Sequence, residues 1–187
     1  MTVVAQRTVN VYERKPLDFY PTPLSVVERL IERAGLDKGD TIWEPAAGDG
    51  AISAPLIRRG FEAYASDINP QGEGIDRLDF LKDSPPHRFD ALVTNPPYGD
   101  AAVQFVKRGL AFMQLGQVDR MLLLLPAEFD FAKGRTRLFR DNRYFCRKAV
   151  LTTRIKWFPE GGMTPTKHHA WFEWRRQPQN IKAMEWW

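Results

Sequence analysis

The tetrapeptide Asn95-Pro96-Pro97-Tyr98 holds groups suited to binding and activating a planar amino nitrogen. Its prolines lack backbone N–H groups, so they stiffen the chain and leave carbonyl oxygens available as acceptors. Hydrogen bonds from an amino group to the Asn95 side-chain oxygen and the Pro96 carbonyl would turn the nitrogen lone pair toward an electrophile. The Tyr98 ring offers a face on which a heteroaromatic ring would stack. The tetrapeptide therefore predicts chemistry on an amino nitrogen, although Pro-Pro turns are also commonly structural.

A glycine-rich turn supplies a second group of candidate residues. The turn includes Glu44, Pro45, Ala46, Gly48 and Gly50. Its glycines allow the backbone to approach a ligand closely, and the helix that follows presents free N–H groups. Asp67 ends the next predicted strand, where a carboxylate can accept hydrogen bonds from ribose hydroxyls. A structural turn explains the glycines alone equally well, but the turn and Asp67 together predict a ligand that contains adenosine.

Three further residues are candidates for the same ligand. Ile68 follows Asp67 directly, and Asp79 and Phe80 end a short third predicted strand. A carboxylate at Asp79 would accept a hydrogen bond from an adenine amino group, and the Phe80 ring would border the base. A surface acid beside a core phenylalanine explains the pair nearly as well.

Strand and helix patterns alternate along the chain. Apolar or alternating runs predict strands over 41–43, 61–68, 74–80, 90–94, 121–125, 150–157 and 169–174. Helical spacing predicts helices from 22 to 34, from 51 to 59, after Tyr98 and over 132–144. This order predicts an α/β fold, a doubly wound and mostly parallel seven-stranded sheet with an antiparallel closing strand. The candidate residues lie at carboxyl ends of strands, where such sheets bind ligands.

Composition limits the functional classes. One cysteine, Cys146, excludes an internal disulfide, and the longest apolar stretch is too short to span a bilayer. The start of the chain has no secretory pattern, so we expect a cytoplasmic protein without a membrane partner. His87, His168 and His169 lack metal-ligand spacing, so no metal site is predicted.

Charge divides unevenly between the two halves of the chain. Residues 1–100 hold 11 Lys and Arg against 16 Asp and Glu, a net charge of −5, and residues 101–187 hold 16 against 7, or +9. The basic segment, residues 133–148, includes Lys133, Arg135, Arg137, Arg140, Arg143, Arg147 and Lys148 against one acid, Asp141. The segment is typical either of a solvated helix face or of a surface that binds phosphates with little sequence choice. Trp157 and Phe158 are candidates for the far wall of a base pocket or for core packing.

These motifs resemble class I S-adenosylmethionine-dependent methyltransferases, specifically the amino-methylating group that carries (N/D)PP(Y/F). The resemblance covers residues 17–175 and implies S-adenosylmethionine as cofactor, with a sulfonium methyl that needs no general base before attack. Residues 44–50 resemble the family's cofactor loop, Asp67 its ribose-binding acid, and Asp79 with Phe80 its adenine motif. The segment 18–23, which contains Tyr20 and Thr22, is similar to the part of N6-adenine DNA methyltransferases that encloses the methionine end of the cofactor.

The resemblance implies methylation of adenine N6 in DNA. The long target-recognition region usual in such enzymes has no counterpart here, so a second subunit or a dimer is an expected source of recognition. The alternatives are methylation of guanine N2 in RNA, methylation of a glutamine amide in a protein, and a catalytically silent subunit that binds nucleic acid. We expect an N-terminal arm (1–16), a catalytic domain (17–176) and a C-terminal tail (177–187).

Overall fold

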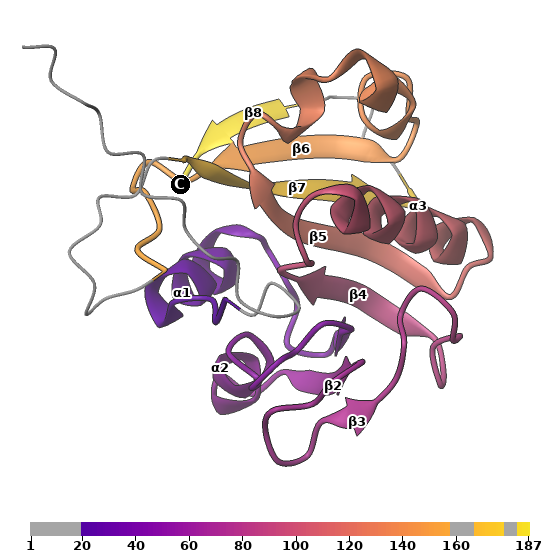
Figure 1. Cartoon of the computed structure of the whole chain (residues 1–187). Coiled ribbons are helices and arrows are strands. Elements are labelled where there is room, and N and C mark those ends of the chain that lie inside the picture. Colours follow the sequence, from indigo (N-terminus) through magenta and orange to yellow (C-terminus); the bar gives the residue numbers. More distant parts are fainter. Residues whose placement is uncertain (1–19, 158–166, 178–182) are drawn as a thin grey trace, which may run out of the picture.

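A single eight-stranded sheet organises the computed structural model, which describes residues 20–157, 167–177 and 183–187 (Figure 1). The predicted N-terminal arm lies outside these residues. The strands are β1 (Thr41–Glu44), β2 (Glu62–Asp67), β3 (Asp76–Arg77), β4 (Phe89–Thr94), β5 (Val118–Pro126), β6 (Phe145–Val150), β7 (His169–Arg175) and β8 (Ala183–Trp186). The helices are α1 (Leu24–Arg33), α2 (Ser53–Arg58) and α3 (Asp100–Gln114), with 3₁₀ turns η2 (Phe129–Phe131) and η3 (Lys133–Leu138).

The strand order is β3-β2-β1-β4-β5-β7-β6-β8. Neighbouring strands are parallel except at β7, which runs antiparallel to both β5 and β6. The predicted mostly parallel sheet with an antiparallel closing strand is thus confirmed. Because β7 is reversed, its first residue, His169, lies at the edge where β4 and β5 end.

Two apolar cores lie on opposite faces of the sheet, because its central strands are buried on both sides. Helices α1 and α2 cover one face and α3 covers the other (Figure 1). In β5, Leu122 and Leu124 belong to the core beneath α1 and α2, whereas Leu123 and Leu125 belong to the core beneath α3. The strict alternation of strand side chains produces this division.

An eighth strand, β8, adds to the seven that the sequence predicts. Ala183–Trp186 pairs in parallel with β6, and Trp187 exchanges backbone hydrogen bonds with Val150 and Thr152. The side chain of Trp187 is buried. A four-residue strand with alternating exposed side chains is too short to give a clear sequence pattern, which explains why it was missed.

Two other predicted elements are wrong. The sixth strand is Phe145–Val150, not 150–157, and residues 132–144 contain 3₁₀ turns and bends instead of a helix. Two cations in this strand, Arg147 and Lys148, are typical of an exposed helix face in the sequence. In the structure both pack inward against acidic partners, so the strand lacks the expected apolar pattern. Cys146 consequently lies in β6, where burial raises the pKa of its thiol to about 11.

Among the described residues, no helix combines the length and apolar character needed to cross a membrane. The same residues contain no cluster of three or more His, Cys, Asp or Glu side chains arranged to hold a metal ion.

Candidate functional site

A cleft of about 440 Å³, partly open to solvent, lies at the carboxyl ends of β1, β2 and β4. Its described lining residues are Tyr20, Pro21, Thr22, Glu44, Ala46, Ala47, Gly48, Asp49, Ala51, Asp67, Asn95 and Pro97. Three of them are acids and none is a cation. Parallel strands end at a common edge, so segments distant in sequence meet there.

The glycine-rich turn connects β1 to α2 through backbone conformations that favour glycine. Gly48 and Gly50 have φ angles of 57° and 85°, in the left-handed region. The Gly48 N–H donates to Asp67 Oδ2 over 2.8 Å, and the Asn69 N–H donates to Asp67 Oδ1 over 2.7 Å. Asp67 therefore holds two turns in place, and each of its oxygens retains lone-pair capacity for a ligand hydroxyl.

Glu44 ends β1 with a buried side chain. Its Oε2 accepts a 2.7 Å hydrogen bond from the Ser53 N–H in the first turn of α2. Burial raises the pKa of Glu44 to about 8, outweighing the hydrogen bond from Ser53, and the nearby charges of Asp49 and Asp67 add to the increase. The carboxyl thus connects the strand to the helix while facing an acidic cleft.

Asn95 places an unpaired acceptor at the cleft. Its Nδ2 donates to the Tyr20 carbonyl over 3.3 Å, which fixes the orientation of the amide. Within the described part of the chain, the buried Asn95 Oδ1 has no hydrogen-bond partner. A buried acceptor without a partner is costly, so this oxygen is suited to an external N–H donor.

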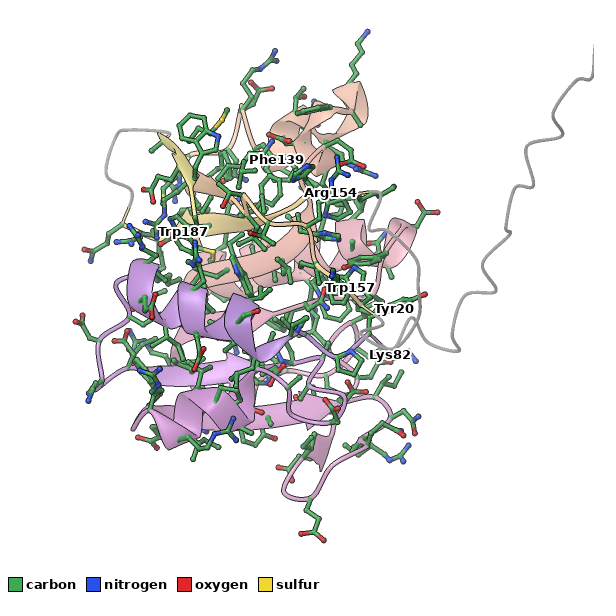
Figure 2. All side chains as sticks on the ribbon, turned by 90° about the vertical axis from the view of Figure 1, so that its left-hand side faces the viewer. Tyr20, Lys82, Phe139, Arg154, Trp157 and Trp187 are labelled. Atoms are coloured by element: carbon green, nitrogen blue, oxygen red, sulfur yellow. The ribbon has the colours of Figure 1, made fainter. Side chains whose placement is uncertain are left out.

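Four rings form an aromatic cluster beside Asn95: Tyr20, Tyr98, Trp157 and His169. The rings of Tyr20 and Tyr98 are nearly parallel, with centroids 6.3 Å apart. The Trp157 ring is tilted relative to Tyr20 and meets Tyr98 edge to face. Tyr98 Oη lies 3.2 Å from Nε2 of the buried His169. Figure 2 shows Tyr20 and Trp157 next to one another.

Sequence reasoning did not assign His169 to this cluster. Burial lowers the pKa of His169 to about 4, so the ring is neutral at pH 7 and its Nε2 can accept from the Tyr98 hydroxyl. The sequence signal for His169 is its position at the start of a predicted strand. This position indicates the site only when the strand is known to run antiparallel, because its first residue then lies at the edge where the parallel strands end.

Several predicted ligand residues do not line the cleft. Phe80 is buried in the core, where its ring contacts Trp43 and Phe105. Asp79 forms an ion pair with Lys82 over 2.9 Å. The cleft lining also omits Pro45, Gly50, Ile68, Pro96 and Tyr98, which adjoin lining residues in sequence.

The basic segment does not form a uniform cationic surface. Arg135 donates to the Phe129 carbonyl and covers its ring, Arg140 pairs with Asp141, and Arg143 packs on Tyr144. The buried Lys148 pairs with Asp130, and Arg147 pairs with Glu173 and Glu185. Lys133 and Arg137 are exposed. The predicted helix is therefore corrected to a 3₁₀ turn followed by bends and the start of β6, while phosphate binding by these cations stays a prediction.

Comparisons with known proteins agree with this architecture. No protein-family model matches the chain. Over 92 residues the chain is 34% identical to the type II methyltransferase M.TthHB8I of Thermus thermophilus, covering 42% of this chain and 20% of that protein. The chain thus spans about a fifth of this relative's length.

Solved structures extend the comparison to the fold. A proposed class I S-adenosylmethionine-dependent methyltransferase from Listeria monocytogenes aligns with a TM-score of 0.63 at 14% identity, over 88% of this chain and 64% of that one. A proposed RNA methyltransferase from Pyrococcus horikoshii aligns with a TM-score of 0.65 at 15% identity, over 85% and 87%. The chain has the class I methyltransferase fold, and its motif order resembles the NPPY group of that class.

Proposed function

We propose that this chain is an S-adenosylmethionine-dependent N-methyltransferase. The observation that carries the proposal is the buried Asn95 Oδ1 at the edge of the cleft, which has no hydrogen-bond partner among the described residues. This oxygen would receive an N–H from an acceptor substrate.

The chemistry of the cleft fits the cofactor. S-Adenosylmethionine carries positive charge on its sulfonium and amino groups. The described lining holds Asp49 and Asp67 without a cation, while the raised pKa of Glu44 keeps that carboxyl neutral at pH 7. Acidic walls around a cleft favour a cationic ligand. Gly48 would allow close backbone approach, and Asp67 would accept the ribose hydroxyls.

The residues of the chain would prepare the nitrogen for attack. The Asn95 Oδ1 and the Pro96 carbonyl would accept its two N–H groups and direct the lone pair toward the cleft. Tyr98 would stack on the substrate ring, and His169 would hold the Tyr98 phenol in position. When bound, the cofactor would supply an electrophilic methyl group, whose bond to sulfur would break with the electron pair left on sulfur as the nitrogen lone pair forms the new bond. The methylated nitrogen then loses one proton.

We infer that the acceptor is adenine N6 in DNA. This choice is supported by the similarity of segment 18–23 to N6-adenine DNA methyltransferases and by the type II methyltransferase among the relatives. The aromatic cluster beside Asn95 is suited to an adenine turned out of a helix.

The decisive experiment identifies the methylated product. Purified protein and S-adenosylmethionine with a deuterated methyl group are incubated separately with DNA, RNA and a protein extract, and digests are analysed by mass spectrometry. We expect N6-methyladenine from DNA. Asn95→Ala should lower methyl transfer at least ~100-fold, because an acceptor acting at the reacting nitrogen is lost. Calorimetry should show that the variant still binds the cofactor, with an affinity reduced far less than methyl transfer, because Asn95 is one of many residues lining the cleft.

The matched control is Gln104→Ala, which removes an exposed amide on α3 and should retain full activity. If the label is found instead on guanine in RNA or on glutamine in protein, that group, and not adenine in DNA, is the methyl acceptor. Absence of both cofactor binding and label would overturn the enzyme proposal.

A further inference from the structure

A second groove lies next to the aromatic cluster, between the start of α1, the segment Leu151–Trp157 and the C-terminal residue. It encloses about 1480 Å³, including space open to solvent. Pro21 and Thr22 line both this groove and the candidate cofactor cleft. Figure 1 shows the C-terminus close to α1, and Figure 2 shows Arg154 and Trp157 in one region of the surface.

The described lining of this groove combines an apolar floor with a cationic rim. Val26, Leu151, Ile155 and Trp187 are buried lining residues. The exposed cations Arg29, Arg154 and Lys156 line the groove as well, and the described lining contains no Asp or Glu. The Arg154 Nε–H also donates to His168 Nε2 over 3.0 Å. The charge of the groove is therefore opposite to that of the neighbouring acidic cleft.

This combination matches a single nucleic acid strand. Such strands are bound by cations that follow the phosphates and by apolar or aromatic surfaces that receive unstacked bases. In a duplex the bases remain stacked inside the helix and would not reach the apolar floor. The hydroxyls of Ser25 and Thr153, also in the lining, are further donors for phosphate oxygens.

We propose that this groove binds the single DNA strand adjoining the target nucleotide. Trp157 belongs both to the groove and to the aromatic cluster, with its ring centroid 6.2 Å from that of Tyr98. A strand in the groove would thus continue into the base position beside Asn95. The assignment of that base rests on the proposed function, but binding of the strand does not require methyl transfer.

The test measures binding of a fluorescent oligothymidine of about 12 nucleotides, within the range of single-strand sites. Thymine has no exocyclic amino group, so turnover does not interfere. The combined variant Arg29→Gln, Arg154→Gln, Lys156→Gln should weaken binding at least ~10-fold. The slope of log K against log salt should fall in magnitude by about 2, corresponding to three single-strand phosphate contacts.

The matched control replaces three other exposed cations, Lys38→Gln, Arg58→Gln and Lys107→Gln, which do not line the groove. It should retain affinity and slope apart from a small general charge effect. Thermal unfolding of both variants should match the unmodified chain, because all six side chains are exposed.

Equal weakening by the two triple variants would overturn the groove proposal, as would tighter binding of a duplex or of oligouridine. These measurements are made without cofactor, so the two proposals fail separately. A chain that binds DNA through the groove but neither binds S-adenosylmethionine nor transfers methyl groups would be a DNA-binding module.

Discussion

Glu44 at the end of β1 and Glu173 in β7 are both buried, yet their surroundings differ in charge. Glu44 faces an acidic cleft, and its pKa is raised to about 8. Burial alone would raise the pKa of Glu173 as well, but Arg120, Arg147 and Arg175 outweigh it and hold that pKa below the ordinary value of 4.5. Among the described residues, no cation lines the cleft that Glu44 faces, whereas arginines pair with Glu173 inside the fold.

The comparison distinguishes two uses of polar groups: those around Glu173 stabilise the fold, whereas those at the cleft are available to a ligand. The guanidinium groups around Glu173 also donate to the Ala34 and Gly35 carbonyls after α1, which joins the helix to the sheet. In the described part of the chain, the cleft instead contains an amide oxygen without a hydrogen-bond partner, and no cation lines it beside its acids. The number of charges in a segment is thus a weaker guide to binding than the partners of each charge.

The largest expected effect is on stability. Glu173→Ala leaves Arg120 and Arg147 buried without their carboxylate, so the free energy of unfolding should fall by about 3–5 kcal/mol in urea titrations. Asp141→Ala removes an exposed ion pair with Arg140 and should cause no measurable change. Because the pKa of Glu173 is lowered on folding, its stabilisation is present above about pH 4.5 and lost as pH falls further. Equal stability of the two variants would show that the network is not structural.

Glu44 should give the opposite pH dependence. Between pH 4.5 and about 8 the folded chain retains a proton at Glu44 that the unfolded chain releases, so stability decreases as pH rises. Glu44→Gln should remove this decrease, a difference of up to about 4 kcal/mol across the interval in urea titrations. Exposed Glu62→Gln is the control. Parallel pH curves for the unmodified chain and Glu44→Gln would contradict the raised pKa.

Asp67→Ala should act on cofactor affinity. It removes charge-assisted hydrogen bonds to two backbone N–H groups and the proposed ribose contact, so the Kd measured by calorimetry should rise at least ~30-fold. Asp76→Asn, an exposed acid on the adjoining β3, should leave the Kd unchanged. If both variants bind the cofactor normally, the ligand does not occupy this cleft as proposed.

The smallest expected effect concerns the basic segment. Lys133→Gln with Arg137→Gln should weaken DNA binding only a few-fold, through general charge. Arg140→Gln should have less effect still, because Asp141 already pairs with that guanidinium. Titrations of each variant with DNA at two salt concentrations measure the affinity and its salt dependence. A larger loss of DNA affinity in this double variant than in the groove variant would show that the basic segment makes the main DNA contact.

The sequence predicted what depends on local motifs and failed where distant segments meet. Gly48, Asp67 and Asn95 follow strands of a regular parallel order, so their convergence on one edge was predictable. His169 joins Tyr98 only because β7 is reversed. The sixth strand was displaced because Lys148 was interpreted as a surface charge, although Asp130 supplies a partner from a separate turn.

The run of four leucines in β5, Leu122–Leu125, has a consequence for how the register of the strand is chosen. A one-residue slip would move Leu122–Leu125 to the opposite faces, but leucine would replace leucine in both cores. Hydrophobicity therefore distinguishes poorly between alternative alignments with β7. Arg120 with Glu173, and Asp119 with Arg176, form ion pairs across the two strands in the native alignment. These charged pairs select one pairing of the central strands from several that the leucines alone would tolerate.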